Sequence, residues 1–188
     1  VAGRVLRRVP VGEGARHLAL HPDGRSLWVA LGSSAAQIAV VDVRDPAHPR
    51  LRGHVRPPFL AHDVGFSSGR RVWVTAGREQ RIALIDTATR RPARILHADA
   101  APQHVSFGGG LAYVASGVAG TVAVHALDDA AVRRRTRVPA GCYNIQRTGP
   151  RVVTPSLGGG RLTVLDRHGR VAGEVHVAAA AHDACIVP

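Results

Sequence analysis

Gly69–Thr87, GRRVWVTAGREQRIALIDT, is the stretch of sequence that decides the fold. It contains a glycine turn, a short apolar run centred on Trp73, a second glycine-containing loop, and another apolar run that ends in Asp86. Each run is too short for a helix, and both are rich in β-branched residues, which is typical of buried strands. The stretch therefore predicts two adjacent antiparallel strands joined by a tight loop.

The same pattern recurs along the chain, in RHLALHPDGRSLWVALG, QHVSFGGGLAYVASG and YNIQRTGPRVVTPSLG. Each copy has a polar residue, a short apolar run, a turn and a second apolar run. The polar positions in one register are His17, Asp63, His104, Asn144 and Asp183, and the centres of the second run are Trp28, Trp73, Tyr113 and Val153. The spacing of about 40–45 residues is the repeat length of propeller blades.

A third and a fourth run complete each copy. The third runs are QIAVVDV, RIALIDT, TVAVHAL and RLTVLDR; three of them place Asp42, Asp86 or Asp166 before a turn, and His125 stands in the remaining copy. A carboxylate at that position can accept hydrogen bonds from backbone N–H groups of the turn. The fourth runs are more polar, as expected for the outermost strand of a blade: residues 51–55, 93–97, 132–138 and 171–177.

We therefore predict an all-β fold, a β-propeller of four-stranded antiparallel blades, forming a single domain over residues 1–188. The repeats are expected at about residues 10–55, 56–97, 98–138 and 139–177, with partial blades at 1–9 and 178–188. Because the two flanking pieces resemble a fourth and a first strand, they cannot close one blade together. We expect the C-terminal part of a ring of six to eight blades, with seven favoured; a closed ring of four or five blades is the alternative.

The net charge is +12, and every cation is an arginine because the chain contains no lysine. The densest run, RRRTR at residues 133–137, falls on a predicted outer strand, where charge discourages the addition of another strand. No aromatic residues interleave with these arginines to stack bases. Nucleic acid is therefore expected to bind only through non-specific charge.

The sequence carries no motif that assigns a reaction. It has no G-x-S-x-G elbow and no phosphate loop, and Cys142 and Cys185 match neither a metal spacing nor a redox C-x-x-C motif. We predict that these two cysteines are not bridged, and we assign no catalytic residue and no cofactor. The uncharged stretch at 100–127 contains several glycines and alternates as strands do, so we expect no membrane span.

PDGRSLWVALG followed by IAVVDV, and GRRVWVTAG followed by IALIDT, resemble the YVTN-type (YncE-like) propeller repeat. In that repeat a proline-aspartate-glycine turn precedes a Tyr-Val-Thr-Asn-like strand and then a Val-Ile-Asp strand. The fourth copy departs from it, lacking the aromatic residue and the aspartate-glycine turn. The resemblance implies a bacterial, secreted or periplasmic protein without an assigned reaction; the start of the chain, VAGRVLRRVP, shows no export signal of its own.

In a propeller, the start of every innermost strand and the loops between second and third strands lie at one rim of the central channel. The rim should gather the residues that we take as candidates for ligand binding: His17, His62, Asp63, His104, Tyr143, Asn144, His182, Asp183, Arg78 and Arg81. We expect a non-catalytic scaffold that binds an unknown small ligand or protein at this face. Two alternatives stay open. In the first, these polar groups serve only as hydrogen-bond partners of backbone groups between the blades. In the second, the rim histidines belong to a metal-assisted enzyme of the lyase or hydrolase type. We assign no metal ligands, because no pair has helix-type ligand spacing.

Two His-Asp pairs precede predicted innermost strands, at residues 62–63 and 182–183. Adjacent side chains on a strand point in opposite directions. We therefore expect Asp63 and Asp183 to bond interblade backbone, while His62 and His182 face the channel.

Overall fold

The structure is a computed structural model that describes residues 4–32 and 34–185. Within these residues sixteen strands form four separate sheets, and every sheet is a four-stranded antiparallel meander. The first sheet contains β1 (Leu18–Leu20), β2 (Ser26–Ala30), β3 (Ile38–Asp42) and β4 (Arg50–Val55). The second contains β5 (Asp63–Ser68), β6 (Arg71–Thr75), β7 (Arg81–Asp86) and β8 (Arg91–His97). The third contains β9 (Pro102–Gly108), β10 (Leu111–Ser116), β11 (Thr121–Ala126) and β12 (Val132–Arg137), and the fourth β13 (Gln146–Thr148), β14 (Arg151–Ser156), β15 (Arg161–Asp166) and β16 (Val171–His176).

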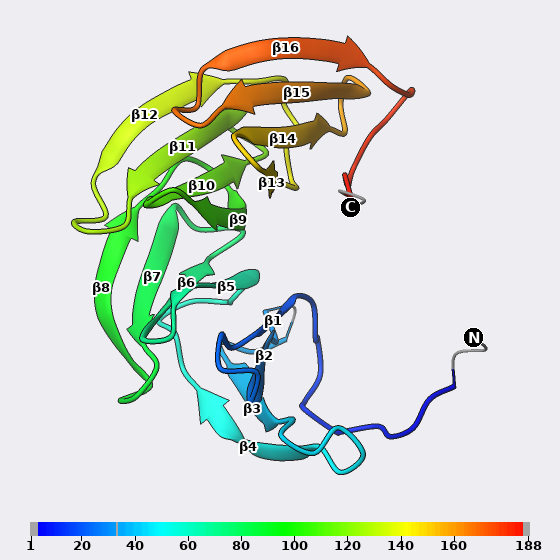
Figure 1. Cartoon of the computed structure of the whole chain (residues 1–188), viewed down its shortest axis with the longest axis vertical. Helices are drawn as coiled ribbons and strands as arrows, with labels where there is room; N and C mark the ends of the chain where they lie inside the picture. The colour runs from blue at the N-terminus through cyan, green and yellow to red at the C-terminus, as the bar shows by residue number, and fades with distance from the viewer. Residues whose placement is uncertain (1–3, 33, 186–188) are drawn as a thin grey trace.

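The four sheets stand side by side as blades along an open arc (Figure 1). The innermost strands β1, β5, β9 and β13 lie on the concave side, and the outermost strands β4, β8, β12 and β16 lie on the convex side (Figure 1). This arrangement confirms the predicted fold class of four propeller blades, and the sheets fall within the repeats expected from the sequence. The described ends of the chain lie at opposite sides of the opening of the arc (Figure 1).

Neighbouring blades are held together by apolar side chains of their middle strands. Trp28 of the first blade packs in one buried cluster with Val64, Val72 and Val74 of the second. In the same way Trp73 packs against the third blade and Tyr113 against the fourth. The second and third sheets are covered on both faces by neighbouring blades, so their strands β7 and β11 read as continuous buried apolar runs.

The aspartates that end the third strands fix the turns that follow them. Asp86 Oδ1 accepts hydrogen bonds from the backbone N–H groups of Ala88 and Thr89 at 3.0 and 2.8 Å. Asp42 and Asp166 accept equivalent bonds. In the third blade the strand register places Ala126 at this position, where we expected His125; the His125 ring is bonded to the Ala130 carbonyl. The turn role that we expected for these carboxylates is confirmed.

The predicted partial strands at the two ends are not formed in the described residues. Residues 4–9 and 178–185 carry no strand, because no neighbouring strand of a further blade lies beside them. Instead, Val11 packs with Val29, Leu31 and Ala39 on the face of the first blade that points away from the second. Residues 1–3 and 186–188 of the predicted partial blades lie outside the described residues.

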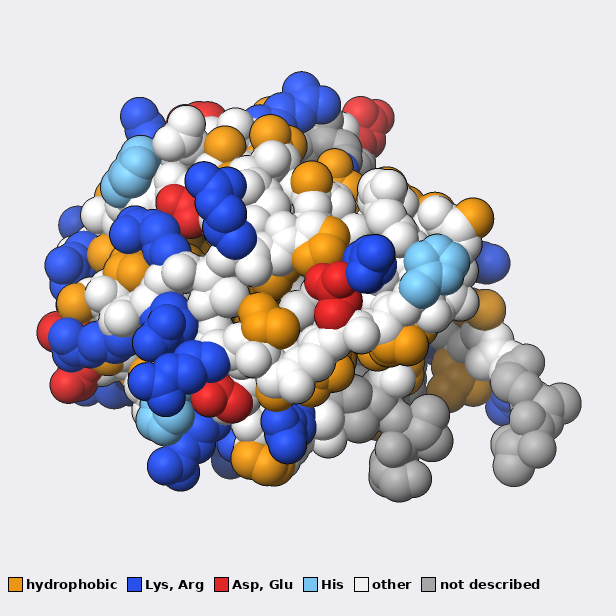
Figure 2. Space-filling view, turned by 90° about the horizontal axis from the view of Figure 1, so that it is seen from above, with side chains coloured by type: hydrophobic (Ala, Val, Ile, Leu, Met, Phe, Trp, Pro, Cys, Tyr) orange, Lys and Arg blue, Asp and Glu red, His pale blue; other side chains and the backbone are white. Residues whose placement is uncertain are grey.

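The remaining sequence expectations concern the surface and the cysteines. The RRRTR run lies on the outer strand β12 as expected, and Figure 2 shows arginine side chains gathered over one side of the molecule. Cys142 is buried, Cys185 is exposed, and the two are not bridged. In the part of the chain that the structure describes, no helix is long and apolar enough to cross a membrane.

Candidate functional site

The strand registers place the starts of the innermost strands at one rim. Ala19, Gly65, Ser106 and Gln146 pair with the central residues Trp28, Trp73, Tyr113 and Val153 of the second strands. The residues two positions earlier are His17, Asp63, His104 and Asn144, so the register read from the sequence is confirmed for four copies. These side chains therefore reach the concave rim from four consecutive blades.

Three histidines from three different blades meet at this rim. One ring nitrogen from each of His17, His62 and His104 lies within 4.8 Å of the others, and all three side chains are partly buried. The ring centroids are 4.2 Å apart for His17 and His104, 5.0 Å for His17 and His62, and 5.7 Å for His62 and His104. The sequence placed these residues on one rim but separated them around the channel; the structure brings them into contact, and we define them as the histidine cluster.

Burial keeps the histidine cluster uncharged. Together with the smaller effects of the neighbouring Arg16 and His17, it lowers the pKa of His62 to about 3 and that of His104 to about 4. The pKa of His17 is lowered for the same reason. At neutral pH all three imidazoles are therefore neutral, which is the form that binds metal ions.

Asp63 anchors the rim between the second and third blades. Its Oδ2 accepts a hydrogen bond from Val105 N on β9 at 3.1 Å, and the same oxygen lies 3.5 Å from His104 Nδ1. Burial raises the pKa of this carboxyl to about 7, because the charged form loses its hydration. The predicted role of Asp63 in bonding interblade backbone is confirmed, and His62 faces the other histidines as expected.

The backbone around His62 leaves room for its ring. Gly77 has a φ of +71°, and a Cβ atom there would lie 2.6 Å from the Cβ atom of His62. The His62 N–H donates to the Thr75 carbonyl at 2.8 Å, and the Thr75 hydroxyl donates to the Gln103 carbonyl of the third blade. Thr75 and Gly77 therefore fix the approach of His62, although no motif in the sequence marked Thr75 as part of the site.

A pocket of about 530 Å³ adjoins the histidine cluster and is lined by residues of four blades. His17, His104, Asp63, Asn144 and Asp183 line it together with apolar and backbone groups of the innermost strands. Asn144 is buried, and its Oδ1 has no hydrogen-bond partner among the described residues. A buried acceptor without a partner costs free energy.

The other predicted rim residues lie in different surroundings. His182 and Tyr143 form a ring contact at 5.7 Å, and Asp183 Oδ2 lies 2.7 Å from His182 Nδ1. Asp183 is exposed and pairs with this neighbouring ring instead of interblade backbone, so that part of the prediction is wrong; no strand of a following blade lies beside it. Arg81 pairs with Glu79 at 3.6 Å.

Neither Arg78 nor Arg81 is among the residues that line the pocket. Both side chains are exposed; Arg78 lies on the loop between β6 and β7, and Arg81 is the first residue of β7. The structure therefore does not place these two arginines in the lining of the pocket.

The chain was compared with family models, with curated proteins and with solved structures. No family model and no curated protein matches it. Among solved structures, it resembles a hydrazine synthase of Kuenenia stuttgartiensis (TM-score 0.74, 18% identity), covering 87% of this chain and 49% of that one. It also resembles a putative 6-phosphogluconolactonase of Bacteroides uniformis (TM-score 0.76, 13% identity; 88% and 56% covered) and apo AztD of Citrobacter koseri (TM-score 0.66, 15% identity; 89% and 47% covered).

At these identities the resemblance shows the fold alone, and that fold is a β-propeller, as the blades and their packing also show. The chain spans about half the length of the solved structures that it matches. Its four blades are thus consistent with part of a larger propeller.

Proposed function

We propose that the rim of this propeller binds one divalent transition-metal ion through the histidine cluster. The observation that carries the proposal is the convergence of three neutral imidazoles, with ring nitrogens within 4.8 Å of one another. Imidazole suits Zn²⁺, Cu²⁺ and Ni²⁺, and three histidines with one open position are an established zinc ligand set. Binding would draw the three ring nitrogens closer together, to Zn–N distances of about 2.0–2.1 Å.

The surroundings of the histidine cluster support this assignment. Metal-binding histidines commonly present their second ring nitrogen to a carboxylate, which fixes the ring and its tautomer. The Asp63 carboxyl lies 3.5 Å from His104 Nδ1 and is itself held by Val105 N. A cation would also favour the ionised form of this buried carboxyl, so metal binding and Asp63 ionisation would assist each other.

The open coordination position would face the pocket of about 530 Å³ that adjoins the cluster. A ligand that carries its own donor atom, or the side chain of a protein partner, could complete the metal coordination there. This is the small-ligand binding that we favour for the rim, with metal-assisted hydrolysis or elimination as the second candidate. The observation that supports this second candidate is the pocket itself, which would leave room for a substrate beside a metal-activated water molecule.

Zinc titration of the purified, chelator-treated protein tests the proposal. We expect one tight site per chain, measured by calorimetry and by metal analysis after desalting. His17→Ala, His62→Ala and His104→Ala should each abolish that site. His176→Ala is the matched control, because His176 is exposed on β16 and should leave the stoichiometry unchanged. Tight binding that survives His62→Ala would overturn the proposal.

We also propose that the blades are of the YVTN type and that the protein works outside the cytoplasm. The support is the sequence motif, above all the runs that end in Asp42 and Asp86 and the turns that these carboxylates fix. Fractionation of cells that express the full-length gene tests the location. Recovery in the cytoplasmic fraction would contradict it.

A further inference from the structure

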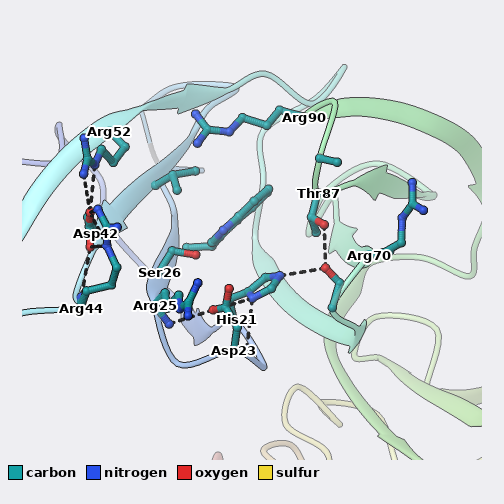
Figure 3. A pocket seen from close by; sticks show the side chains of 14 residues that line it. His21, Asp23, Arg25, Ser26, Asp42, Arg44, Arg52, Arg70, Thr87 and Arg90 are labelled. Atoms are coloured by element: carbon teal, nitrogen blue, oxygen red, sulfur yellow. Dashed lines mark hydrogen bonds and ion pairs between the residues drawn. The ribbon is translucent and has the colours of Figure 1, made fainter.

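A second pocket lies at the opposite rim from the histidine cluster, between the first and second blades (Figure 3). The chain reaches this rim at the β1–β2 and β3–β4 loops of the first blade and at the corresponding loops of the second. The pocket has a volume of about 410 Å³, within the range of about 300–1,000 Å³ that is usual for small-molecule sites. It shares no lining residue with the pocket beside the histidines.

Positive charge dominates the lining of this pocket. Five arginines line it, Arg25, Arg44, Arg52, Arg70 and Arg90, against only two carboxylates, Asp23 and Asp42. Figure 3 shows that they come from both blades, with Arg90 reaching from the second blade toward the first. So many like charges repel one another, and an anion between them would relieve that repulsion.

The arginines differ in how far the protein itself neutralises them. Arg44 and Arg52 share the Asp42 carboxylate, with Nη2–Oδ2 distances of 2.5 and 2.6 Å. Arg70 lies 3.7 Å from Asp86. In the part of the chain that the structure describes, the guanidinium groups of Arg25 and Arg90 have no hydrogen-bond or ion-pair partner. These two groups are available to a ligand.

The next groove along the arc shows what a purely structural arginine does. Between the second and third blades, Arg71 donates to the Leu127 carbonyl at 3.1 Å, and Arg94 donates to the Asp129 carbonyl. Both guanidinium groups thereby join the two blades. Arg25 and Arg90 line the groove between the first and second blades, and among the described residues neither guanidinium group forms such a bridge.

The backbone of Arg90 adds to this contrast. Its φ is +57°, a left-handed conformation that glycine adopts more readily than arginine. The equivalent turn residues are Ala130 in the third blade and Gly169 in the fourth. A long cation at this position is therefore not required by the turn.

The pocket also offers an apolar part. Trp28 and Val40 line it beside the arginines, and the Trp28 Nε1–H is buried without a hydrogen-bond partner among the described residues. We propose that this pocket binds a small organic phosphate. The phosphate group contacts Arg25 and Arg90, and the organic part lies against Trp28.

Phenyl phosphate is the test ligand, with inorganic phosphate and phenol as comparisons. We expect saturable binding at moderate salt, with phenyl phosphate tighter than phosphate and phenol not bound. Tryptophan fluorescence provides the readout, because Trp28 lines the pocket while Trp73 is fully buried between the second and third blades. The change in signal should persist in Trp73→Phe and disappear in Trp28→Phe.

Arginine variants separate a specific site from the general charge of the protein. Arg25→Gln and Arg90→Gln should each lower the affinity for phenyl phosphate by about tenfold, the effect of losing one charge-assisted hydrogen bond. Arg137→Gln is the matched control, since Arg137 is exposed on β12 and should change the affinity less than twofold. Equal weakening by all three variants would overturn the site, and equal affinity for phosphate and phenyl phosphate would overturn the organic part of the ligand.

Discussion

Replacing Asp63 tests whether the rim depends on one interblade hydrogen bond. Asp63→Ala removes the acceptor of the Val105 N–H and leaves that donor without its partner, partly buried between two blades. A buried donor without a partner costs about 1–3 kcal/mol. In a chain of this size 1 kcal/mol corresponds to about 2–4 °C in Tm. We therefore expect a Tm lower by about 6 °C for a loss of about 2 kcal/mol.

Asp63→Asn separates the hydrogen bond from the charge. The amide oxygen still accepts from Val105 N, so we expect most of the stability to remain. The pKa of Asp63 is about 7 in the folded protein and 3.8 as its ordinary value, so the folded state binds the extra proton between these pH values. The contribution of the carboxyl to stability is therefore full below pH 3.8 and is lost as pH rises through 7. As pH rises from 3.8 to 7, the free energy of unfolding of Asp63→Asn should therefore increase relative to that of the wild type.

Chemical and thermal unfolding at pH 5 and pH 8, in the presence of a chelator, measure these effects. His62→Ala serves as the control, because His62 makes no side-chain bond to interblade backbone among the contacts described above. Its Tm should stay close to that of the wild type. The reasoning would be refuted if Asp63→Asn lost as much stability as Asp63→Ala. It would also be refuted if His62→Ala lowered the Tm more than Asp63→Ala does.

Three further predictions concern the rim and the buried thiol. The pKa values of His62 and His104 are about 3 and 4, below the ordinary 6.5. The unfolded chain therefore binds more protons than the folded protein, and the contribution of these two residues to stability is lost as pH falls from 6.5. Replacing both by Gln should flatten the pH dependence of the free energy of urea unfolding between pH 4 and 6.5. Burial raises the pKa of Cys142 to about 11, so in the native protein a thiol reagent should modify the exposed Cys185 quickly and Cys142 only upon unfolding; rapid labelling of both would contradict the burial. Gly77→Ala places a methyl group against His62 in a left-handed backbone, and zinc affinity measured by calorimetry should fall even where the circular dichroism spectrum is unchanged.

The fold could be predicted from the sequence because the information is local and repeated. Trp28, Trp73 and Tyr113 mark the middle of the second strand of three blades. Asp42, Asp86 and Asp166 mark the end of the third strand in three blades. Periodicity of this kind survives wide divergence, since each blade must bury the same two faces.

The site was predicted less completely. The register identified which side chains reach the rim, but distances across the concave side depend on blade rotation and on the ring orientations of His17, His62 and His104. No local pattern encodes these quantities. The role predicted for Asp183 failed for a related reason. It required a strand of a following blade beside Asp183, and the described residues contain no such strand.

The arginine pocket was not foreseen, and the reason is physical. The sequence showed arginines everywhere, and composition alone accounts for most of them. Arg71 and Arg94 bind carbonyl groups of the next blade, whereas Arg25 and Arg90 bind no such group among the described residues. That difference becomes visible only when two blades are placed side by side.

The origin of the histidine cluster in three consecutive blades has a consequence for cooperativity. In a repeat protein each unit ordinarily interacts only with its immediate neighbours, so stability propagates along the chain as a nearest-neighbour sum. His17 and His104 belong to the first and third blades, whose sheets are separated by the second. A ligand bound to all three histidines would therefore couple the stability of the first blade to that of the third, an interaction that is absent when each blade contacts only its immediate neighbours. Three blades that could otherwise separate in turn would then be released together, in one cooperative step.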